Sequence, residues 1–238
     1  MNRQARFTAR LQAAVLSLAM ILLTSVPAHA EDGWMRVASA RADNDVSLWT
    51  RHLSGQQMKQ FRGETHARAS LEQALSLFLD MDATPGWLYR CQEAKILEKV
   101  SANEYIVHLK FNAFWPLQDR DAVLRIMGTR HPGTGAVLLT GTALPDYLPA
   151  RPDVVRVPAI AASFILEPVK EHKLRLEMTG HFDPGGVVPV WMANMVVTIL
   201  PKHSLSMMSS ILGESYYTGT RAETGRKALA EIPATPTP

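Results

Sequence analysis

Few residues of this 238-residue chain are spaced for acid–base chemistry. His181 and Asp183 are two residues apart, so a β-strand would place both side chains on one face. The same face would carry Lys173, Arg175 and Glu177, which is typical of a strand surface that meets water. We therefore interpret the pair as surface residues rather than as a catalytic dyad.

Other signatures of chemistry are also missing from the sequence. It has no GxSxG, HExxH, GxxxxGK[ST], CxxC or GxGxxG motif, which disfavours the hydrolases, zinc proteases, nucleotide-binding and redox proteins that use them. The eight histidines lack ligand spacing, so we predict no metal site. Asp119 and Asp121 flank Arg120, where a local salt bridge or turn hydrogen bonds explain them better than catalysis.

The most unusual stretch is 182–201, FDPGGVVPVWMANMVVTILP. A Gly-Gly turn leads into about three helical turns that are apolar on nearly every side, with Asn194 and Thr198 on one face. Such a helix must be buried or must cover something apolar. Its reach of about 18 Å is too short for a bilayer core of about 30 Å, so we predict a core helix or a lid over an apolar ligand.

The elements around this stretch follow from hydrophobic periodicity. We predict strands over 45–53, 60–68, 93–100, 104–111, 121–130, 136–143, 157–168 and 173–182. Helices are expected near 33–42, from the capping box Ser70/Gln73 to Asp82, and along the apolar stretch to 212, with Pro201 breaking or kinking the last one. The alternation within the strands indicates an α+β fold with an antiparallel sheet. That sheet must curl, and the C-terminal helix would fill its concave side.

The two ends of the chain are expected to lie outside this domain. Residues 1–30 look like a signal peptide: three arginines, an apolar run over 11–26, and the cleavage site Ala28-His29-Ala30. An uncleaved anchor is the alternative. We therefore expect an exported, periplasmic or extracellular protein with a lone buried Cys91. Removing three arginines from 25 basic residues leaves 22, equal to the acidic count, so we expect no nucleic-acid partner. Residues 213–238 form a C-terminal extension whose Pro/Thr/Ala tail is expected to be disordered.

Two motifs resemble the START domain, the family related to the steroidogenic acute regulatory protein. One is WPLQDRDAV at 115–123, and the other is DPGGVVPVWMAN at 183–194. The resemblance covers roughly 33–212, so we assign 31–212 to one START-like domain. It implies a helix-grip fold: a curved antiparallel sheet wrapped around the last helix, with an apolar tunnel between them. It also implies one bound lipid and no cofactor.

The resemblance also suggests which residues form the site. In sterol-binding members a buried tunnel arginine matches Arg125, and its carboxylate partner corresponds to Asn112, which cannot neutralise it. A lipid phosphate or carboxylate would suit Arg125; the alternative is an exposed strand arginine. The predicted ligand-binding residues are Arg125, Asn112, Tyr105, Val123, Met127, Trp191, Asn194, Met195 and Thr198, and the predicted gate residues are Phe114, Trp115, Pro116, Leu117, Gly185, Gly186 and Pro201.

Three functions fit these expectations. The first is a monomeric, non-catalytic carrier that holds one phospholipid, sterol or fatty acid and touches membranes transiently. The second is a helix-grip enzyme, such as a cyclase or hydrolase, acting on a hydrophobic substrate. The third is an envelope interaction protein whose core is filled.

Overall fold

The computed structural model describes residues 33–42, 45–214 and 217–235. The predicted leader, 1–30, and the last three residues of the predicted tail lie outside this part. The chain divides into residues 1–34 and a folded unit, Met35–Pro238, and only the folded unit is described below.

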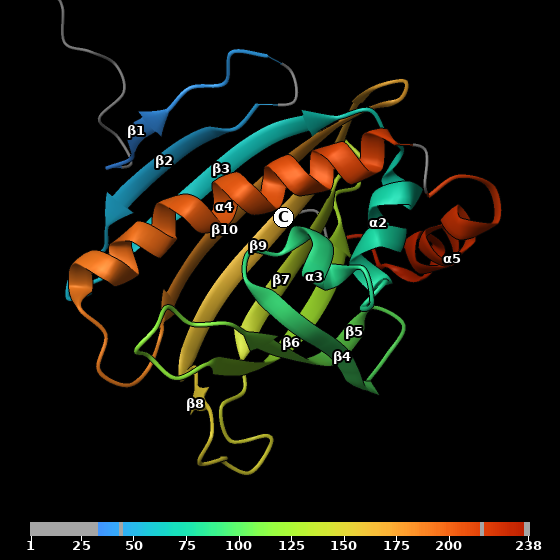
Figure 1. Cartoon of the computed structure of the whole chain (residues 1–238). Helices are drawn as coiled ribbons and strands as arrows, with labels where there is room; N and C mark the ends of the chain where they lie inside the picture. Colours follow the sequence, from blue (N-terminus) through green and yellow to red (C-terminus); the bar gives the residue numbers. More distant parts are fainter. Residues whose placement is uncertain (1–32, 43–44, 215–216, 236–238) are drawn as a thin grey trace, which may run out of the picture. The chain divides into compact units, whose positions relative to one another are not determined.

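The folded unit combines ten strands with helices, and from β2 to α4 the elements follow the order expected from the sequence, with α3 and β8 added (Figure 1). The strands are β1 Met35–Ala38, β2 Ser47–His52, β3 Lys59–Ala67, β4 Cys91–Lys99, β5 Glu104–Phe111, β6 Arg120–Arg130, β7 Val137–Ala143, β8 Val155–Arg156, β9 Ala159–Lys170 and β10 Lys173–Asp183. The helices are α2 Leu71–Leu79, α3 Thr84–Trp87, α4 Val190–Gly213, the short 3-10 helix η1 Gly219–Ala222 and α5 Glu223–Glu231.

One curved sheet holds all the strands, in the order β1-β2-β3-β10-β9-β7-β6-β5-β4, and β8 adds to β6. Every pair is antiparallel except β6 with β8, so the predicted antiparallel sheet is confirmed. The helix expected over 33–42 is wrong, because Met35–Ala38 is a strand whose Arg36 pairs with Trp49 of β2.

Alternation along β10 explains which face of the sheet is dry. Leu174, Leu176 and Met178 are buried beneath the helices. Between them, Arg175 forms ion pairs on the outer face with three carboxylates from β3, β9 and its own strand, those of Glu64, Glu167 and Glu177. The side-chain period of two therefore sends apolar groups inward and a salt-bridge network outward.

The long helix α4 packs on the inner face of the sheet, mainly against β3 (Figure 1). Its buried positions recur every three or four residues: Ala193, Val197, Pro201, Ser204, Leu205, Met208, Ser209 and Leu212. A Cβ at Gly63 of β3 would lie 2.8 Å from Leu205 Cδ1 and 3.1 Å from Pro201 Cβ. Glycine therefore allows a close approach of the helix to the strand, and a larger residue would force Leu205 and Pro201 to shift.

The helix is longer than the sequence led us to expect. Its 24 residues continue through Pro201 and span about 36 Å, so the predicted reach of about 18 Å is wrong. Of the two effects expected of Pro201, the break is wrong and the kink stays a prediction. By length and composition alone, α4 could cross a membrane, the one helix of the described residues of which this holds. Its buried stripe is instead committed to the sheet, as in the core helix of a folded domain.

The predicted extension after 212 is part of the fold. Tyr217 is buried, and its hydroxyl donates a hydrogen bond of 2.8 Å to Asp80. Gly225 of α5 packs on α2 so closely that a Cβ would lie 1.8 Å from the Glu72 carbonyl oxygen. Thr235 donates to the Arg130 carbonyl at 2.8 Å, so the tail is docked at least to that residue. The expectation of a disordered tail is wrong for 232–235.

Candidate functional site: an apolar cavity under the long helix

A cavity of about 310 Å³ lies between α4 and the inner face of the sheet. Its volume falls near the lower end of the range of about 300–1,000 Å³ for small-molecule sites. Strands β5, β6, β7, β9 and β10 supply the largest share of the wall, and the helices α2, α3, α4 and α5 and the connecting segments supply most of the remainder. The wall residues are overwhelmingly apolar, so the cavity suits an apolar ligand.

Three aromatic rings form the side of the cavity next to α2 and α3. Phe78 of α2 lies edge-on to Phe164 of β9, with ring centroids 4.8 Å apart, and Trp87 of α3 contacts both rings. Edge-to-face packing of this kind fixes rigid apolar surfaces. The capping box predicted at Ser70 is present and begins α2 at Leu71, which fixes the start of the helix that carries Phe78.

Small residues on the sheet leave room for part of the cavity. Gly141 of β7, Ala162 of β9 and Gly180 of β10 are neighbours across three strands, and all three line the cavity. Larger side chains at these positions would project into the space above them. The ring of Phe61 already occupies the position over Gly180, where a Cβ would lie 2.5 Å from it.

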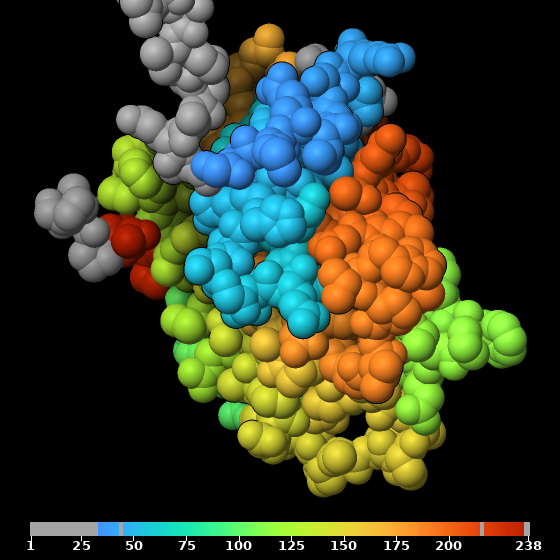
Figure 2. All heavy atoms as spheres, turned by 90° about the vertical axis from the view of Figure 1, so that its left-hand side faces the viewer, coloured from blue at the N-terminus to red at the C-terminus, as the bar shows by residue number. Residues whose placement is uncertain are grey.

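One end of the cavity, here called the loop end, is lined by two connections. The loop over 112–118 contributes Phe114 and Leu117, and the segment leading into α4 contributes Pro184 and Val188. Beside these residues, large apolar side chains face outward: Trp115 is 91% exposed, Val187 94% and Trp191 68%. Figure 2 shows the green segment around 115 projecting beside the orange start of α4. The peptide bond Trp115-Pro116 is cis.

The opposite end, here called the α5 end, is closed by the C-terminal part of the fold. Ala228 and Ile232 line it together with Ala102, Asn103 and Gly128 of the β4–β5 hairpin and β6. Asn103 Nδ2 donates to the Gly128 carbonyl at 2.8 Å, and Gly128 N donates to the Asn103 carbonyl at 2.9 Å. This end was not predicted from the sequence, although small and apolar residues recur there at helical spacing: Ala222, Gly225, Ala228 and Ile232.

The structure corrects the position of Arg125. Its side chain is 50% exposed and pairs with Glu104 at 3.1 Å on the outer face, so the predicted tunnel arginine is wrong and the exposed-arginine alternative holds. Val123 and Met127 share that face and do not line the cavity. The inward residues of β6 are instead Leu124, Ile126 and Gly128, one residue out of register from the prediction.

The other predicted ligand-binding residues divide into two groups. Tyr105 and Asn112 line the cavity, and whether they contact a ligand stays a prediction. Trp191, Asn194, Met195 and Thr198 do not line it, because the inward face of α4 here carries Met192, Ala193 and Val196. Asn194 Oδ1 instead accepts a hydrogen bond of 3.0 Å from Lys59 N, and Thr198 donates to the Met195 carbonyl at 2.9 Å.

The predicted gate residues are also divided. Phe114 and Leu117 line the loop end, whereas Trp115 and Pro116 point away from the cavity. Gly185 and Gly186 both have positive φ angles, +67° and +63°, in the turn before α4, which favours glycine. Pro201 lies inside a continuous helix, packed against β3, and its role in a gate stays a prediction.

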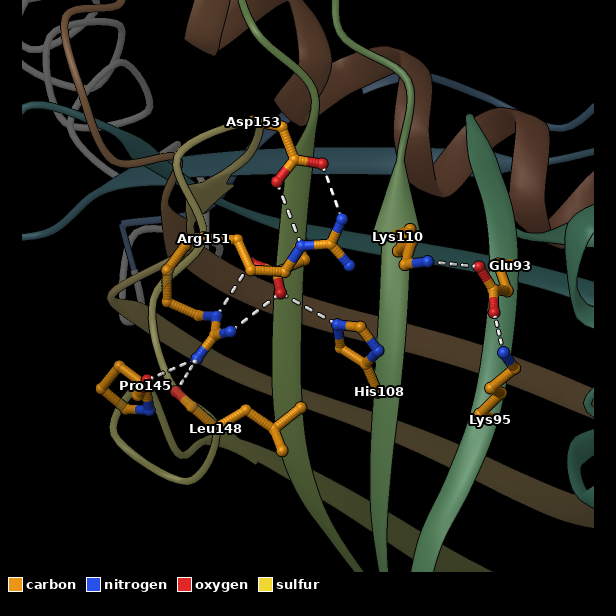
Figure 3. A network of polar contacts seen from close by, with 10 residues as sticks. Glu93, Lys95, His108, Lys110, Pro145, Leu148, Arg151 and Asp153 are labelled. Carbon is orange, nitrogen blue, oxygen red and sulfur yellow. Dashed lines mark hydrogen bonds and ion pairs between the residues drawn. The ribbon is translucent and has the colours of Figure 1, made fainter.

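A polar network supports the loop end from the outer face of the sheet (Figure 3). Asp121 is 1% exposed; it accepts two hydrogen bonds from Arg156, at 2.8 and 2.9 Å, and contacts His108 at 2.9 Å. Burial favours the neutral acid, but the hydrogen bonds from Arg156 and His108 outweigh it and hold the pKa of Asp121 below its usual 3.8. Arg156 also donates to the carbonyls of Pro145 and Leu148, which fixes the loop over the sheet.

Neighbouring titratable groups offer no catalytic arrangement. Lys110 and Lys95 donate to Glu93 and lower the pKa of that exposed carboxyl to about 2, which makes a surface ion-pair cluster (Figure 3). Cys91 is buried as predicted, and burial raises the pKa of its thiol to about 11. Across the described part of the chain, no group of three His, Cys, Asp or Glu is placed to hold a metal.

Comparison with known proteins matches this architecture to one family. The model of the START domain matches residues 17–202, more than three quarters of the chain. The chain belongs to the START domain family. The helix-grip fold predicted from the two motifs is therefore confirmed, with the curved sheet and the C-terminal helix in the expected positions.

Solved START structures resemble the protein along most of its length. A STAR-related lipid transfer protein fragment from Xanthomonas axonopodis is 28% identical, with a TM-score of 0.69, over 76% of this chain and 99% of that one. Human StAR-related lipid transfer protein 5 is 17% identical, with a TM-score of 0.65, over 88% and 98%. An uncharacterized Pseudomonas aeruginosa protein is 26% identical over 72% of this chain and 84% of its own.

Proposed function

We propose that this START domain binds one lipid in the cavity and carries it between membranes without changing it chemically. The observation that carries the proposal is the 310 Å³ apolar cavity under α4, in a protein whose 28%-identical structural relative is named as a lipid transfer protein. Transfer of an acyl chain from water into such a space contributes about 0.8 kcal/mol per CH₂. A ligand could therefore bind tightly with few polar contacts.

The composition of the wall favours a carrier over an enzyme. No aspartate, glutamate, lysine or cysteine is among the described wall residues. His181 borders the cavity, but its Nε2 lies 3.4 Å from Gln56 Oε1 and no carboxylate pairs with it among the described residues. A cyclase or hydrolase needs converging acid and base groups, and the cavity offers none.

Membrane contact is proposed for the loop end. Trp115, Val187 and Trp191 are large apolar side chains exposed beside the cavity, on two neighbouring segments. Clusters of this kind mark interaction surfaces, and Trp prefers the membrane–water interface. Docking through this surface would bring the lipid entrance against the bilayer.

We also propose that the protein acts as an exported monomer after removal of residues 1–30. One experiment addresses location, assembly and cargo together: native mass spectrometry of the protein purified from a periplasmic extract. We expect one chain beginning at Glu31 with one lipid bound. Absence of the protein from the periplasmic extract would contradict export, and a mass that includes the leader would contradict its cleavage. A dimer mass would contradict the monomer, and an empty protein that takes up no added lipid would contradict the carrier.

The cavity itself is tested with a matched pair of variants on β9. Ala162 lines the cavity, and its neighbour Ala161 is exposed on the outer face. Ala162→Phe should reduce binding of a fluorescent fatty acid at least about tenfold, because the ring occupies the ligand's space. Ala161→Phe should leave binding unchanged. Equal binding by both variants, with unchanged melting temperatures, would place the bound fatty acid outside this cavity, and no binding by the wild type would favour the filled-core interaction protein.

A further inference from the structure

The charged groups on the cavity wall are all of one sign. Arg90 and Arg120 are the lining residues that are charged at every physiological pH, and both lie at the loop end. The described wall contains no acidic side chain to balance them. A cavity that is otherwise apolar thus has positive charge at one end.

Arg120 is the more buried of the two. It is the first residue of β6 and is 9% exposed. Its Nε donates to the Pro184 carbonyl at 3.4 Å and its Nη1 donates to the Gln118 carbonyl, so it joins the two segments of the loop end. Within the described residues, no carboxylate lies within 4 Å of its guanidinium and Nη2 has no hydrogen-bond acceptor. Burial lowers the pKa of Arg120, as expected of a cation without a close counter-charge.

Arg90 holds the 112–118 loop from its other side. Its Nε donates to the Asn112 carbonyl at 2.7 Å, its Nη2 donates to the Ala113 carbonyl at 2.6 Å, and its guanidinium lies 4.2 Å from the centre of the Phe114 ring. Among the described residues its guanidinium forms no ion pair, and its charge acts on Asp119 only as a minor cause of the lowered pKa of that carboxyl. Carbonyl oxygens therefore orient both guanidinium groups but leave their charges largely unbalanced.

Two exposed carboxylates lie in this region, and the charge that acts on Arg120 is that of Asp119. Asp183 accepts a hydrogen bond of 2.9 Å from Gly185 N, and the oxygens of Asp119 also have partners. They accept hydrogen bonds from Ala113 N at 2.9 Å and from Gln92 Nε2 at 3.0 Å. These two bonds, more than the charges of Arg90 and Arg120, lower the pKa of Asp119. Asp119 is itself exposed, so water weakens its attraction to the buried Arg120.

We infer that the loop end binds the phosphate or carboxylate headgroup of an anionic lipid, with Arg120 in direct contact and Arg90 beside it. The inference rests on the proposed lipid-binding function and narrows it to a ligand class. A guanidinium presents parallel N–H donors that match phosphate and carboxylate oxygens. The chain of the same ligand would extend from Arg120 along the apolar wall toward the α5 end.

The test compares headgroups on one acyl chain. Oleoyl lysophosphatidate, oleate and the neutral monoolein are titrated into the full-length protein by isothermal calorimetry, and inorganic phosphate is titrated alone. We expect both anionic lipids to bind at least about tenfold more tightly than monoolein, which corresponds to one or two charge-assisted hydrogen bonds. Inorganic phosphate alone should bind far more weakly than either.

Three variants test whether Arg120 causes the preference for anionic lipids. Arg120→Gln should remove the preference for anionic lipids and leave monoolein binding unchanged, and Arg120→Lys should keep part of it. Arg125→Gln, on the outer face of the same strand, is the matched control and should behave as wild type. If Arg120→Gln does not fold, Arg120→Lys and the wild-type headgroup series still decide the question.

The possible outcomes distinguish failure of the headgroup inference from failure of the proposed lipid-carrier function. Equal affinity for all three lipids, or an equal loss of affinity for all three in Arg120→Gln, would contradict headgroup binding. Arg120 would then only connect the two loops through its hydrogen bonds. Phosphate binding as tight as lysophosphatidate binding would make the site one for free anions. Failure of every lipid to bind would overturn the proposed carrier itself.

Discussion

The loop end and the α5 end close the same cavity with different kinds of structure. At the loop end, two connections without regular structure meet over Arg120, and their apolar tips Trp115 and Val187 face outward. At the α5 end, a helix packs on α2 and Ile232 covers Gly128 of β6. Loops held by a few hydrogen bonds open at lower cost than packed helices. We therefore predict that a ligand enters between the two loops, and that the packed α5 end stays closed.

The largest predicted effect on stability concerns the Asp121–Arg156 ion pair on the outer face of the sheet at the loop end. Asp121→Asn should lower the free energy of unfolding by about 3–5 kcal/mol, because it leaves Arg156 buried without a carboxylate. Urea denaturation at pH 7, 5 and 3 measures it. Asp153→Asn, which breaks an exposed pair with Arg151, is the control and should cost less than about 1 kcal/mol.

The pH dependence of that variant has a defined sign. The folded pKa of Asp121 is below 3.8, so its ion pair contributes stability above that pH and loses it as pH falls through the folded value. The gap between wild type and Asp121→Asn should therefore narrow from pH 5 to pH 3. A gap that stays constant would show that Asp121 does not act through its charge.

A smaller effect is predicted for the α5 end. Gly225→Ala places a Cβ against the backbone of α2 and should cost about 1–3 kcal/mol of stability through forced separation of the helices. Gly213→Ala, where a Cβ meets nothing within 4 Å, is the control in α4. Amide hydrogen exchange should show faster exchange in α5 for Gly225→Ala only. Unchanged protection of α5 would contradict a packed, fixed end.

The smallest effect on stability belongs to the exposed tips of the loop end. Trp115→Ser combined with Val187→Ser should change the free energy of unfolding by less than about 0.5 kcal/mol per site, since both side chains are in water. The same double variant should slow lipid transfer between vesicles severalfold. Val169→Ser, an exposed apolar residue of β9, controls for general surface polarity. Unaltered transfer in the double variant would place the entrance elsewhere.

Much of the fold followed from local patterns in the sequence. Strand β5 was predicted at its observed bounds, because Tyr105, Val107, Leu109 and Phe111 alternate with polar residues. The capping box of α2 was also predicted correctly, from Ser70 and Gln73. The strand β1 was missed because its four residues are mostly exposed and depend on pairing with β2 rather than on their own pattern.

The site was harder to predict than the fold, for a physical reason visible in β6. The loop carrying Pro145 and Leu148 covers its outer face, so Ala122, Val123 and Leu124 are all buried and the strand lacks a clear dry side. The assignment of Arg125 to the tunnel followed the family resemblance instead. A polar residue between Leu124 and Ile126 was the local signal that it points outward.

The pairing of β3 with β10 has a consequence for how the chain reaches this structure. Leu174 lies opposite Ala67, so the centre of the sheet joins segments more than a hundred residues apart, and α4 then packs on β3 from still further along the chain. Contacts so distant in sequence must overcome a large loop-closure entropy and slow the search for the native state. Until β10 pairs with β3, one edge of β3 is unpaired, and until α4 packs on the sheet the cavity is not covered. We therefore expect the cavity to form late in folding, after β10 has paired with β3 and α4 has packed on it.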